Sequence, residues 1–528
     1  MRIINIAIVL SALMLTSCEK WLDLKPDTQA TEEQVFSTAS GYHSVLNGLY
    51  KSMATSDLYG VELAFGIVDC MSQQYSLKIA NDVTSRQTYK DAGDFKYNSS
   101  YMTPALESMW LSAFNIIANA NNLIQNTENA PEDMFKQGKM EKNLILGEAY
   151  ACRALIHFDM LRLFAPAVVH DDGQPYVPYV ERYPNIQAGG IAVKPFLDKV
   201  IADLEKGREL QKEWDTSDIG VGLQITGDAR FYNQFSFGTV IYGEYSMGQK
   251  IDAFFKGRGY RLNYYAITAL LARVYQYAER YEEAFTCAQE IMDFKLEDYY
   301  GMQSAFGVDN YSKIRNGNWD AKTDLKVVSN LIFAVYNEKA YSDFGLEYFF
   351  KKEFYSGSYP TWLVINQEAQ KTFYTREGID ESETDYRSLN MIFRATNSAG
   401  QYPISGKYYC SENETTRDKN LAILPVIRST EMRYIMAEYY ARKSQFGEAQ
   451  TILNDIRKNR GCIENITISN WTEFVNELVR DARREWISEG QLFYLYKRLD
   501  ASIDFGKNVV RPLTRSEYLV PIPSNQSL

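Results

Sequence analysis

The sequence has 528 residues, with 56 basic and 67 acidic side chains that give a formal net charge of −11. The acidic balance and the lack of a basic stripe argue against nucleic acid as a partner and against a polybasic membrane-binding surface. The chain is longer than one typical core, yet no linker rich in proline, glycine and serine divides it, so we expect one large body with two closely packed halves.

The N-terminus has the layout of a bacterial export signal. Arg2 precedes an almost wholly apolar stretch, residues 3–15, which is shorter than the roughly 20 residues that span a bilayer as a helix. The segment Leu15-Thr16-Ser17-Cys18 resembles a lipobox, where a peptidase cuts before a cysteine that carries lipid. We therefore expect a signal peptide over 1–17 and a tether over 18–31 that begins at the lipidated Cys18. The alternative is an ordinary signal peptide with an incidental cysteine.

Helical spacing dominates the N-terminal half, where apolar residues recur at intervals of three and four. The stretches with this spacing are 32–53, 102–126, 139–164, 191–214 and a helical hairpin over 261–292. The segments between them are rich in polar residues, glycine and proline, which favours loops and short pieces of helix.

The C-terminal half contains fewer long periodic stretches. Residues 331–336 are apolar and β-branched enough for a short strand. A second helical hairpin is predicted over 428–460 and a last long helix over 471–499, followed by an extended tail over 512–528.

The two predicted hairpins resemble each other in sequence over 272–284 and 437–449. In each, an aromatic side chain stands three residues before an alanine, as Tyr281 does before Ala284. This pattern is like the tetratricopeptide repeat, in which helix pairs stack through small and aromatic residues. The expected fold class is therefore mainly α, with tetratricopeptide-like hairpins stacked into a superhelical layer. Long irregular loops and a few short β-hairpins should lie on one side of that layer.

The six cysteines include no C-x-x-C pair. Cys152 and Cys287 fall on core-facing positions of helical patterns, where free cysteine acts as a small hydrophobe, so we expect a core-stabilised body and not a disulfide scaffold. The three histidines are too scattered to suggest a metal site, and we expect no cofactor. No H-E-x-x-H, phosphate-binding or G-x-S-x-G motif occurs, so we expect a binding protein and not an enzyme.

Several weak motifs follow one another in an order that resembles the SusD/RagB family of outer-membrane glycan-binding lipoproteins. Beyond the lipobox, these are Trp21-Leu22-Asp23, Glu148-Ala149, Arg153-Ala154, residues 269–275, Asp385-Tyr386-Arg387, Ile427-Arg428, residues 453–457, Arg483-Arg484-Glu485, Glu489-Gly490 and residues 519–523. The resemblance implies a lipid-anchored protein on the outer membrane, exposed at the cell surface, with a SusD-like N-terminal half over 32–300 and a C-terminal half over 301–528. It also implies that the protein captures oligosaccharide or polysaccharide and delivers it to a SusC-like TonB-dependent porin.

A glycan site needs aromatic rings for the apolar face of each sugar and polar groups for its hydroxyl rim. The resemblance implies a shallow site on the irregular segments. The candidates with this chemistry are Tyr97, Asn98, Tyr101, Tyr311 and Trp319, with Arg86 and Asn81 as hydrogen-bond partners. Trp362 is a reserve candidate, and the alternative for every one of these rings is ordinary loop packing.

Glu485 and Glu489 stand four apart on the last predicted helix and cannot pair with each other. At least one should bridge to another helix, with Arg428 or Arg433 as partner. Two other functions remain open: a helical-repeat scaffold that binds peptides or envelope proteins, and an α-helical glycoside hydrolase, whose paired carboxylates need only be close in space.

Overall fold

The computed structural model describes most of the chain after the expected tether. The described residues are 31–77, 86–184, 189–233, 251–294, 306, 317–353, 361–366, 373–376, 378–397, 400–505 and 509–523. The predicted signal peptide, Cys18 and the site candidates Asn81 and Tyr311 lie outside these residues.

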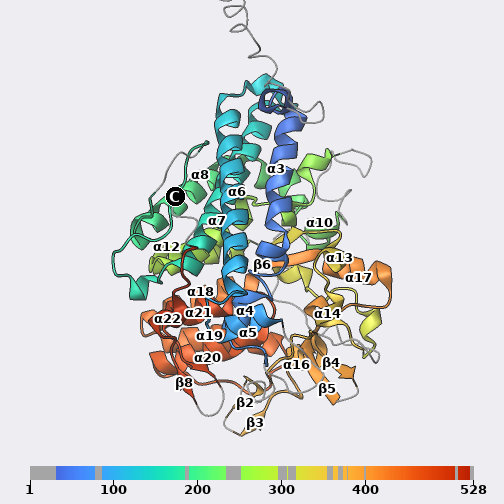
Figure 1. Cartoon of the computed structure of the whole chain (residues 1–528), viewed down its shortest axis with the longest axis vertical. Helices are drawn as coiled ribbons and strands as arrows, with labels where there is room; N and C mark the ends of the chain where they lie inside the picture. Colours follow the sequence, from blue (N-terminus) through green and yellow to red (C-terminus); the bar gives the residue numbers. More distant parts are fainter. Residues whose placement is uncertain are drawn as a thin grey trace, which may run out of the picture.

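The N-terminal half is built from helices, with α6 and α7 running side by side along the length of the molecule (Figure 1). Its helices are α2 (Glu32–Val35), α3 (Ala39–Met53), α4 (Ile67–Met71), α5 (Gln87–Gly93), α6 (Met102–Asn129), α7 (Gly138–Phe164), α8 (Val193–Asp215), α9 (Asp218–Gly222), α10 (Gly227–Tyr232), α11 (Tyr264–Tyr277) and α12 (Tyr281–Asp293). A short 3₁₀ turn, η6 (Arg258–Tyr260), precedes α11.

In its described segments, the C-terminal half adds shorter helices and four antiparallel two-stranded sheets, which pair β1 with β6, β2 with β3, β4 with β5 and β7 with β8. The helices are α13 (Ala340–Asp343), α14 (Glu347–Phe350), α16 (Tyr386–Met391), α17 (Glu414–Leu421), α18 (Ser429–Arg442), α19 (Phe446–Asn459), α20 (Trp471–Glu485), α21 (Leu492–Leu499) and α22 (Arg515–Tyr518). The strands are β1 (Leu331–Tyr336), β2 (Thr375–Arg376), β3 (Ile379–Asp380), β4 (Ile392–Asn397), β5 (Gly400–Ser405), β6 (Ile423–Arg428), β7 (Ile503–Asp504) and β8 (Val510–Arg511).

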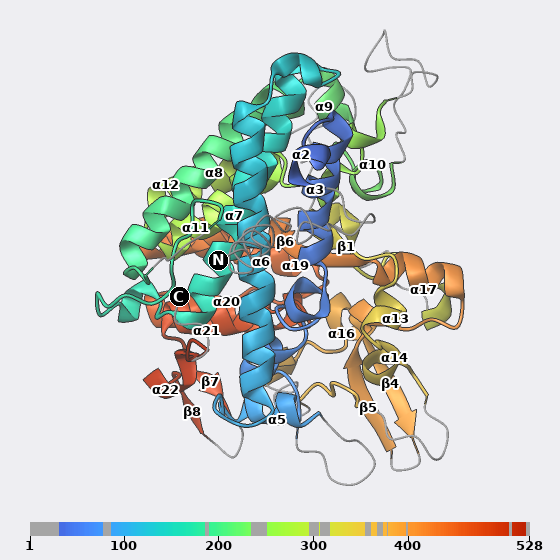
Figure 2. The ribbon, with the colours of Figure 1, turned by 45° about the horizontal axis from the view of Figure 1, so that its top comes forward.

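The long helices form one continuous stack. In order of contact, α3 packs on α6, α6 on α7, α7 on α8, α8 on α11, α11 on α12, α12 on α18, α18 on α19 and α19 on α20. The two tetratricopeptide-like hairpins, α11–α12 and α18–α19, meet in the middle of this series, which confirms the predicted layer. Figure 2 shows β4, β5 and the short helices α13, α14 and α17 together on the side away from α8 and α12.

Helix α7 lies between α6 and α8 and is buried on all sides from Leu144 to Phe164. Its close contact with α8 depends on two glycines, because a Cβ on Gly147 would come within 2.9 Å of the carbonyl oxygen of Gly207. Polar side chains inside this contact are paired: Arg153 donates two hydrogen bonds to the carboxylate of Asp203, at 2.7 and 2.6 Å. The helix therefore holds its neighbours by both packing and buried ion pairs.

The predicted long helix over 471–499 is wrong, because the chain turns between α20 and α21. In this turn Ser488 and Gly490 both take left-handed backbone conformations, with φ of 62° and 68°. The buried carboxylate of Asp69 accepts hydrogen bonds from their backbone N–H groups, at 2.7 and 3.2 Å. Asp69, about 420 residues earlier in the chain, thus stabilises a turn between the two helices that the spacing of apolar residues does not predict.

The expectation for the C-terminal tail needs a smaller correction. The tail after 512 is not wholly extended, because α22 forms behind a capping box made by Thr514 and Glu517. The segment over 215–259 contains the short helices α9 and α10, in line with the short pieces of helix expected between the long ones. The chain between Leu58 and Met71 is almost entirely buried.

The predicted bridge from Glu489 to Arg428 is confirmed, with Nε of the arginine 2.8 and 2.6 Å from the two carboxylate oxygens. Lys407 also binds Glu489, at 2.7 Å. The five cysteines that the structure describes are all buried and free, which agrees with a core-stabilised body.

Candidate functional site

Those ring candidates that the structure describes do not converge on one site. Tyr97 is only 6 % exposed, and its hydroxyl donates to the backbone carbonyl of Glu517. Packing against the C-terminal tail therefore leaves little of this ring open to solvent. Tyr101, at the start of α6, is 55 % exposed.

The other described candidates pack against different parts of the fold. The ring of Trp319 is half-buried, with Tyr409 at 5.3 Å between ring centroids and the ammonium of Lys322 at 4.0 Å. The guanidinium of Arg86 lies 4.5 Å from the ring of Phe349. The reserve candidate Trp362 is fully buried.

Tyr97 and Asn98 do line a small cleft of about 560 Å³ beside the C-terminal tail. Its remaining lining consists of Phe95, Lys96, Ser99, Ser516, Leu519 and Pro521. The cleft has one amide and few exposed rings, so it offers less of the chemistry expected of a glycan site.

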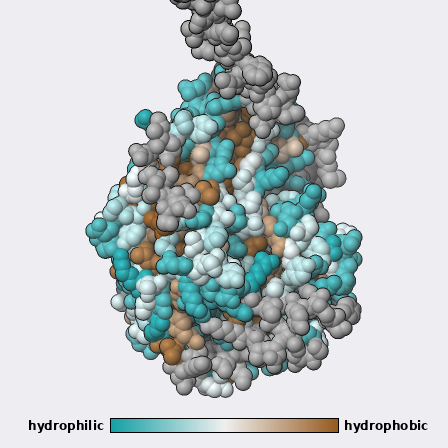
Figure 3. Space-filling view, viewed as in Figure 1, coloured by the Kyte–Doolittle hydropathy of each residue, from teal (hydrophilic) through white to brown (hydrophobic). Residues whose placement is uncertain are grey.

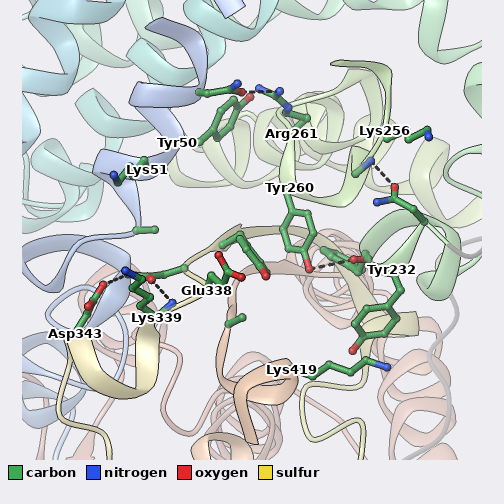
Figure 4. Close-up of a pocket in the computed structure, with 18 residues that line it drawn as sticks. Tyr50, Lys51, Tyr232, Lys256, Tyr260, Arg261, Glu338, Lys339, Asp343 and Lys419 are labelled. Atoms are coloured by element: carbon green, nitrogen blue, oxygen red, sulfur yellow. Dashed lines mark hydrogen bonds between the residues drawn. The ribbon is translucent and has the colours of Figure 1, made fainter. Parts of the chain in front are cut away.

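A larger cleft of about 920 Å³ lies where α3, α10, η6, the end of β1, α13 and α17 meet, and we call it the tyrosine cleft (Figure 4). Its lining residues are Asn47, Tyr50, Lys51, Ala54, Phe231, Tyr232, Asn233, Lys256, Gly257, Tyr260, Arg261, Tyr336, Asn337, Glu338, Lys339, Asp343, Lys419 and Ala422. Aromatic rings, amides and ammonium groups thus gather around one cavity.

Tyr260 stands in the middle of the tyrosine cleft. Its ring lies 5.1 Å from that of Tyr336, at an interplanar angle of 61°, and 5.1 Å from that of Phe231. Its hydroxyl donates to the carbonyl of Phe231 at 3.2 Å, which holds the ring in place. Tyr336 is 46 % exposed, and Tyr232 lies under the ammonium of Lys419 at 3.9 Å. The result is a set of inclined rings, of which Tyr336 is exposed while Tyr232 and Tyr260 are partly buried.

Local sequence explains these positions. Helix α10 ends at Tyr232 because Asn233 takes a left-handed conformation, with φ of 52°. The amide oxygen of Asn233 accepts a hydrogen bond from the backbone of Gly257 at 2.8 Å, which ties α10 to the start of η6. Tyr336 is the last residue of β1, paired with Ile423, and therefore projects where the ladder ends.

Buried ion pairs support the floor of the tyrosine cleft. The hydroxyl of Tyr50 donates to Glu148 at 2.6 Å and accepts from the backbone of Leu262 at 2.9 Å. Arg258, at the start of η6, is fully buried between Glu148 at 3.2 Å and Asp215 at 2.9 Å. These contacts fix η6, and with it Tyr260, to helices α7 and α8.

Electrostatics keep the cleft hydroxyls protonated. Burial raises the pKa of Tyr232 and of Tyr260, and burial together with the nearby carboxylate of Glu338 raises the pKa of Tyr336. Tyr232 and Tyr336 can therefore donate hydrogen bonds into the cleft at neutral pH, while the hydroxyl of Tyr260 already donates to the carbonyl of Phe231. The amides of Asn47 and Asn337 add further donors and acceptors.

The sequence contains a signal for this cleft that spacing arguments overlooked. Tyr232-Asn233 and Tyr336-Asn337 are both a tyrosine followed by an asparagine, the same pair as the predicted Tyr97-Asn98. Such a pair places a ring and an amide side by side, as sugar binding requires. Only the fold reveals which of these pairs share a cavity.

Within the described residues, no group of three or more His, Cys, Asp or Glu side chains is placed to hold a metal ion. Over the same residues, no helix combines the length and apolar character needed to cross a bilayer. The face seen in Figure 3 carries hydrophobic patches scattered among hydrophilic ones.

Part of the chain matches a known protein family. Residues 20–217 match a SusD-like family model described as "Starch-binding associating with outer membrane". This part of the chain is similar to SusD-like proteins. The description of that family names the binding of starch.

Related proteins extend the comparison. "SusD-like protein P2" from Formosa agariphila is 25 % identical over 213 residues, which span 40 % of this chain and only 38 % of that relative. A SusD superfamily protein from Bacteroides thetaiotaomicron is similar in structure with a TM-score of 0.66 at 19 % identity, covering 92 % of this chain and 97 % of the other.

Two further solved structures carry binding descriptions. A "SusD-like carbohydrate binding protein" from Bacteroides vulgatus has a TM-score of 0.64 at 16 % identity, over 92 % of this chain and 95 % of the other. A "Laminarin binding SusD-like protein" has a TM-score of 0.61 at 16 % identity, over 93 % and 98 %. At these identities the likeness establishes the fold.

Proposed function

We propose that this SusD-like protein binds carbohydrate in the tyrosine cleft. The observation that carries the proposal is the convergence of Tyr232, Tyr260 and Tyr336 on one cavity of about 920 Å³, a volume typical of ligand sites. Ring faces fit the apolar face of a sugar, while amides and ammonium groups fit its hydroxyls. The carbohydrate and laminarin binding described for two relatives of the same fold supports the proposal.

The bound sugar would then pass to a SusC-like TonB-dependent porin, with the protein held at the outer membrane by lipid on Cys18. Support for this part of the proposal comes from the lipobox-like segment 15–18 and from the outer-membrane association in the family description. Two measurements test it. Mass spectrometry of the protein from its native host should find an acylated N-terminal cysteine in place of residues 1–17, and affinity purification from outer membranes should recover a porin.

Binding itself is tested by titration calorimetry of the purified full chain against a panel of plant, host and microbial oligosaccharides. We expect at least one of them to bind. If the folded protein bound none, the proposal would be overturned.

Replacing Tyr336 with alanine should weaken binding of that oligosaccharide about tenfold, because an aromatic contact contributes about 0.5–1.5 kcal/mol beyond the area that it buries. Tyr336 is half-exposed at a strand end, so the fold should tolerate the change. Tyr101→Ala is the matched control, because the ring of Tyr101 is similarly exposed but lies outside the tyrosine cleft. The Tyr101→Ala variant should bind the oligosaccharide with the affinity of the unmodified protein. Equal losses in both variants would contradict the assignment of the site.

A further inference from the structure

Four ammonium groups surround the tyrosine cleft of a protein whose net charge is −11. They belong to Lys51, Lys256, Lys339 and Lys419. No carboxylate of the described residues forms an ion pair with any of them, whereas most other basic side chains near the core are paired, as Arg261 is with Glu148. The positive charge of these lysines is therefore available to a ligand.

The lysines come from four separate segments. Lys51 lies on α3, Lys256 precedes η6, Lys339 precedes α13 and Lys419 lies on α17. Figure 4 shows them on different sides of the cleft, with the ring of Tyr260 between them. A single anionic group cannot reach all of them, but a chain with a negative group on several of its units can.

Two acidic residues also line the cleft, and they leave a positive excess. Asp343 accepts a hydrogen bond from the amide of Asn337 at 3.2 Å, and Glu338 is exposed near Tyr336. Four ammonium groups against two carboxylates give an excess of two positive charges at the mouth of a concave, partly apolar site. Such a site concentrates positive potential locally even on an acidic protein.

We propose that the tyrosine cleft selects anionic oligosaccharides, whose carboxylate or sulfate groups pair with the surrounding lysines while their ring faces pack on the tyrosines. This inference rests on the proposed carbohydrate-binding function and narrows it to one class of sugar. Uronic acids and sulfate esters present the same kind of charge, so the test separates them.

The full chain is titrated with three ligands of equal length: an oligogalacturonate, a sulfated galactan oligosaccharide and a neutral gluco-oligosaccharide. We expect one of the two anionic ligands to bind more tightly than the neutral one, and its affinity to fall as salt is added, because salt screens exposed charges. The preferred anionic ligand identifies the source of the charge.

Variants then assign the effect to the cleft. Lys51→Gln and Lys339→Gln should each weaken binding of the anionic ligand about two- to fivefold, since an exposed ion pair contributes at most about 1 kcal/mol. Glu338→Gln should strengthen binding of the anionic ligand by a similar factor. A purely structural role of Glu338 would not predict tighter binding. Lys194→Gln is the control, because this exposed lysine on α8 lies outside the cleft.

The two levels of the proposal fail in different ways. Equal affinity for neutral and anionic ligands, unaffected by salt and by the lysine variants, would overturn the inference and leave carbohydrate binding intact. If the folded protein bound no sugar of any kind, both would be overturned.

Discussion

Arg460→Ala is expected to lower the free energy of unfolding by about 3–5 kcal/mol, because it leaves a buried carboxylate without its main partner. Arg460 and Glu485 are both fully buried, and Nη2 and Nε of the arginine lie 2.8 and 3.0 Å from the two carboxylate oxygens. The pair joins the end of α19 to the end of α20. Burial alone would raise the pKa of Glu485, but the positive charge of Arg460 holds that pKa well below the usual range of a glutamate. The carboxylate is therefore charged at neutral pH.

The remaining partners of Glu485 cannot compensate for this loss. Arg387 binds Glu485 at 3.1 Å but also binds Asp385 and Asp481, at 2.9 and 2.8 Å. Without Arg460, Arg387 would have to neutralise Glu485 while it also binds Asp481 and Asp385, and of these two only Asp385 is also bound by Arg484, at 3.1 Å.

Urea unfolding followed by circular dichroism measures the loss. Arg433→Ala is the control, because it removes an arginine from the same helical hairpin whose partner, Asp455, is 51 % exposed. An exposed pair of this kind contributes about 0–1 kcal/mol. Similar losses in the two variants would show that burial does not set the strength of these ion pairs.

The same contacts explain why Glu485 and Glu489 are not catalytic candidates. Each is at most 5 % exposed and is bound by two basic side chains: Arg460 and Arg387 for the first, Arg428 and Lys407 for the second. The charged motifs that resemble the family near the C-terminus thus form the interior of the helical stack.

Local periodicity predicts most of this fold. The expected helices over 102–126 and 191–214 agree with α6 and α8 to within three residues at each end, and both hairpins occur as expected. These elements are amphipathic, so their own residues determine their form. The turn between α20 and α21 escaped prediction because its decisive partner, Asp69, comes from a distant part of the chain.

The site was less predictable for the same physical reason. The rings of Tyr232, Tyr260 and Tyr336 come from α10, η6 and β1, and nothing in their spacing shows that these elements meet. The ring of Tyr97 has suitable chemistry, but it is buried. Its hydroxyl donates a hydrogen bond to the backbone carbonyl of Glu517, near the other end of the chain. Composition identifies candidate residue types, while long-range packing decides which of them face solvent.

Arg258→Met should lower both the stability of the protein and its affinity for sugar. Arg258 donates to Asp215 at 2.9 and 3.0 Å and forms an ion pair with Glu148 at 3.2 Å, and all three side chains are fully buried. Removing the guanidinium should lower the free energy of unfolding by about 3–5 kcal/mol, because two carboxylates lose their shared cation. Urea unfolding measures this change.

Binding should weaken as well, under conditions in which the variant is still folded. Arg258 is the first residue of η6 and Tyr260 is the last, so loss of the anchor releases the central ring of the cleft. Calorimetry should then show weaker binding, although Arg258 itself does not line the cavity.

A second substitution separates positioning from simple destabilisation. Asp215→Asn in the Arg258→Met background removes one of the stranded charges and should recover part of the stability. It should not recover affinity, because η6 still lacks its tie to α8. Recovery of both together would show that the cleft depends on global stability alone, whereas unchanged affinity in Arg258→Met would show that other contacts hold Tyr260 in place.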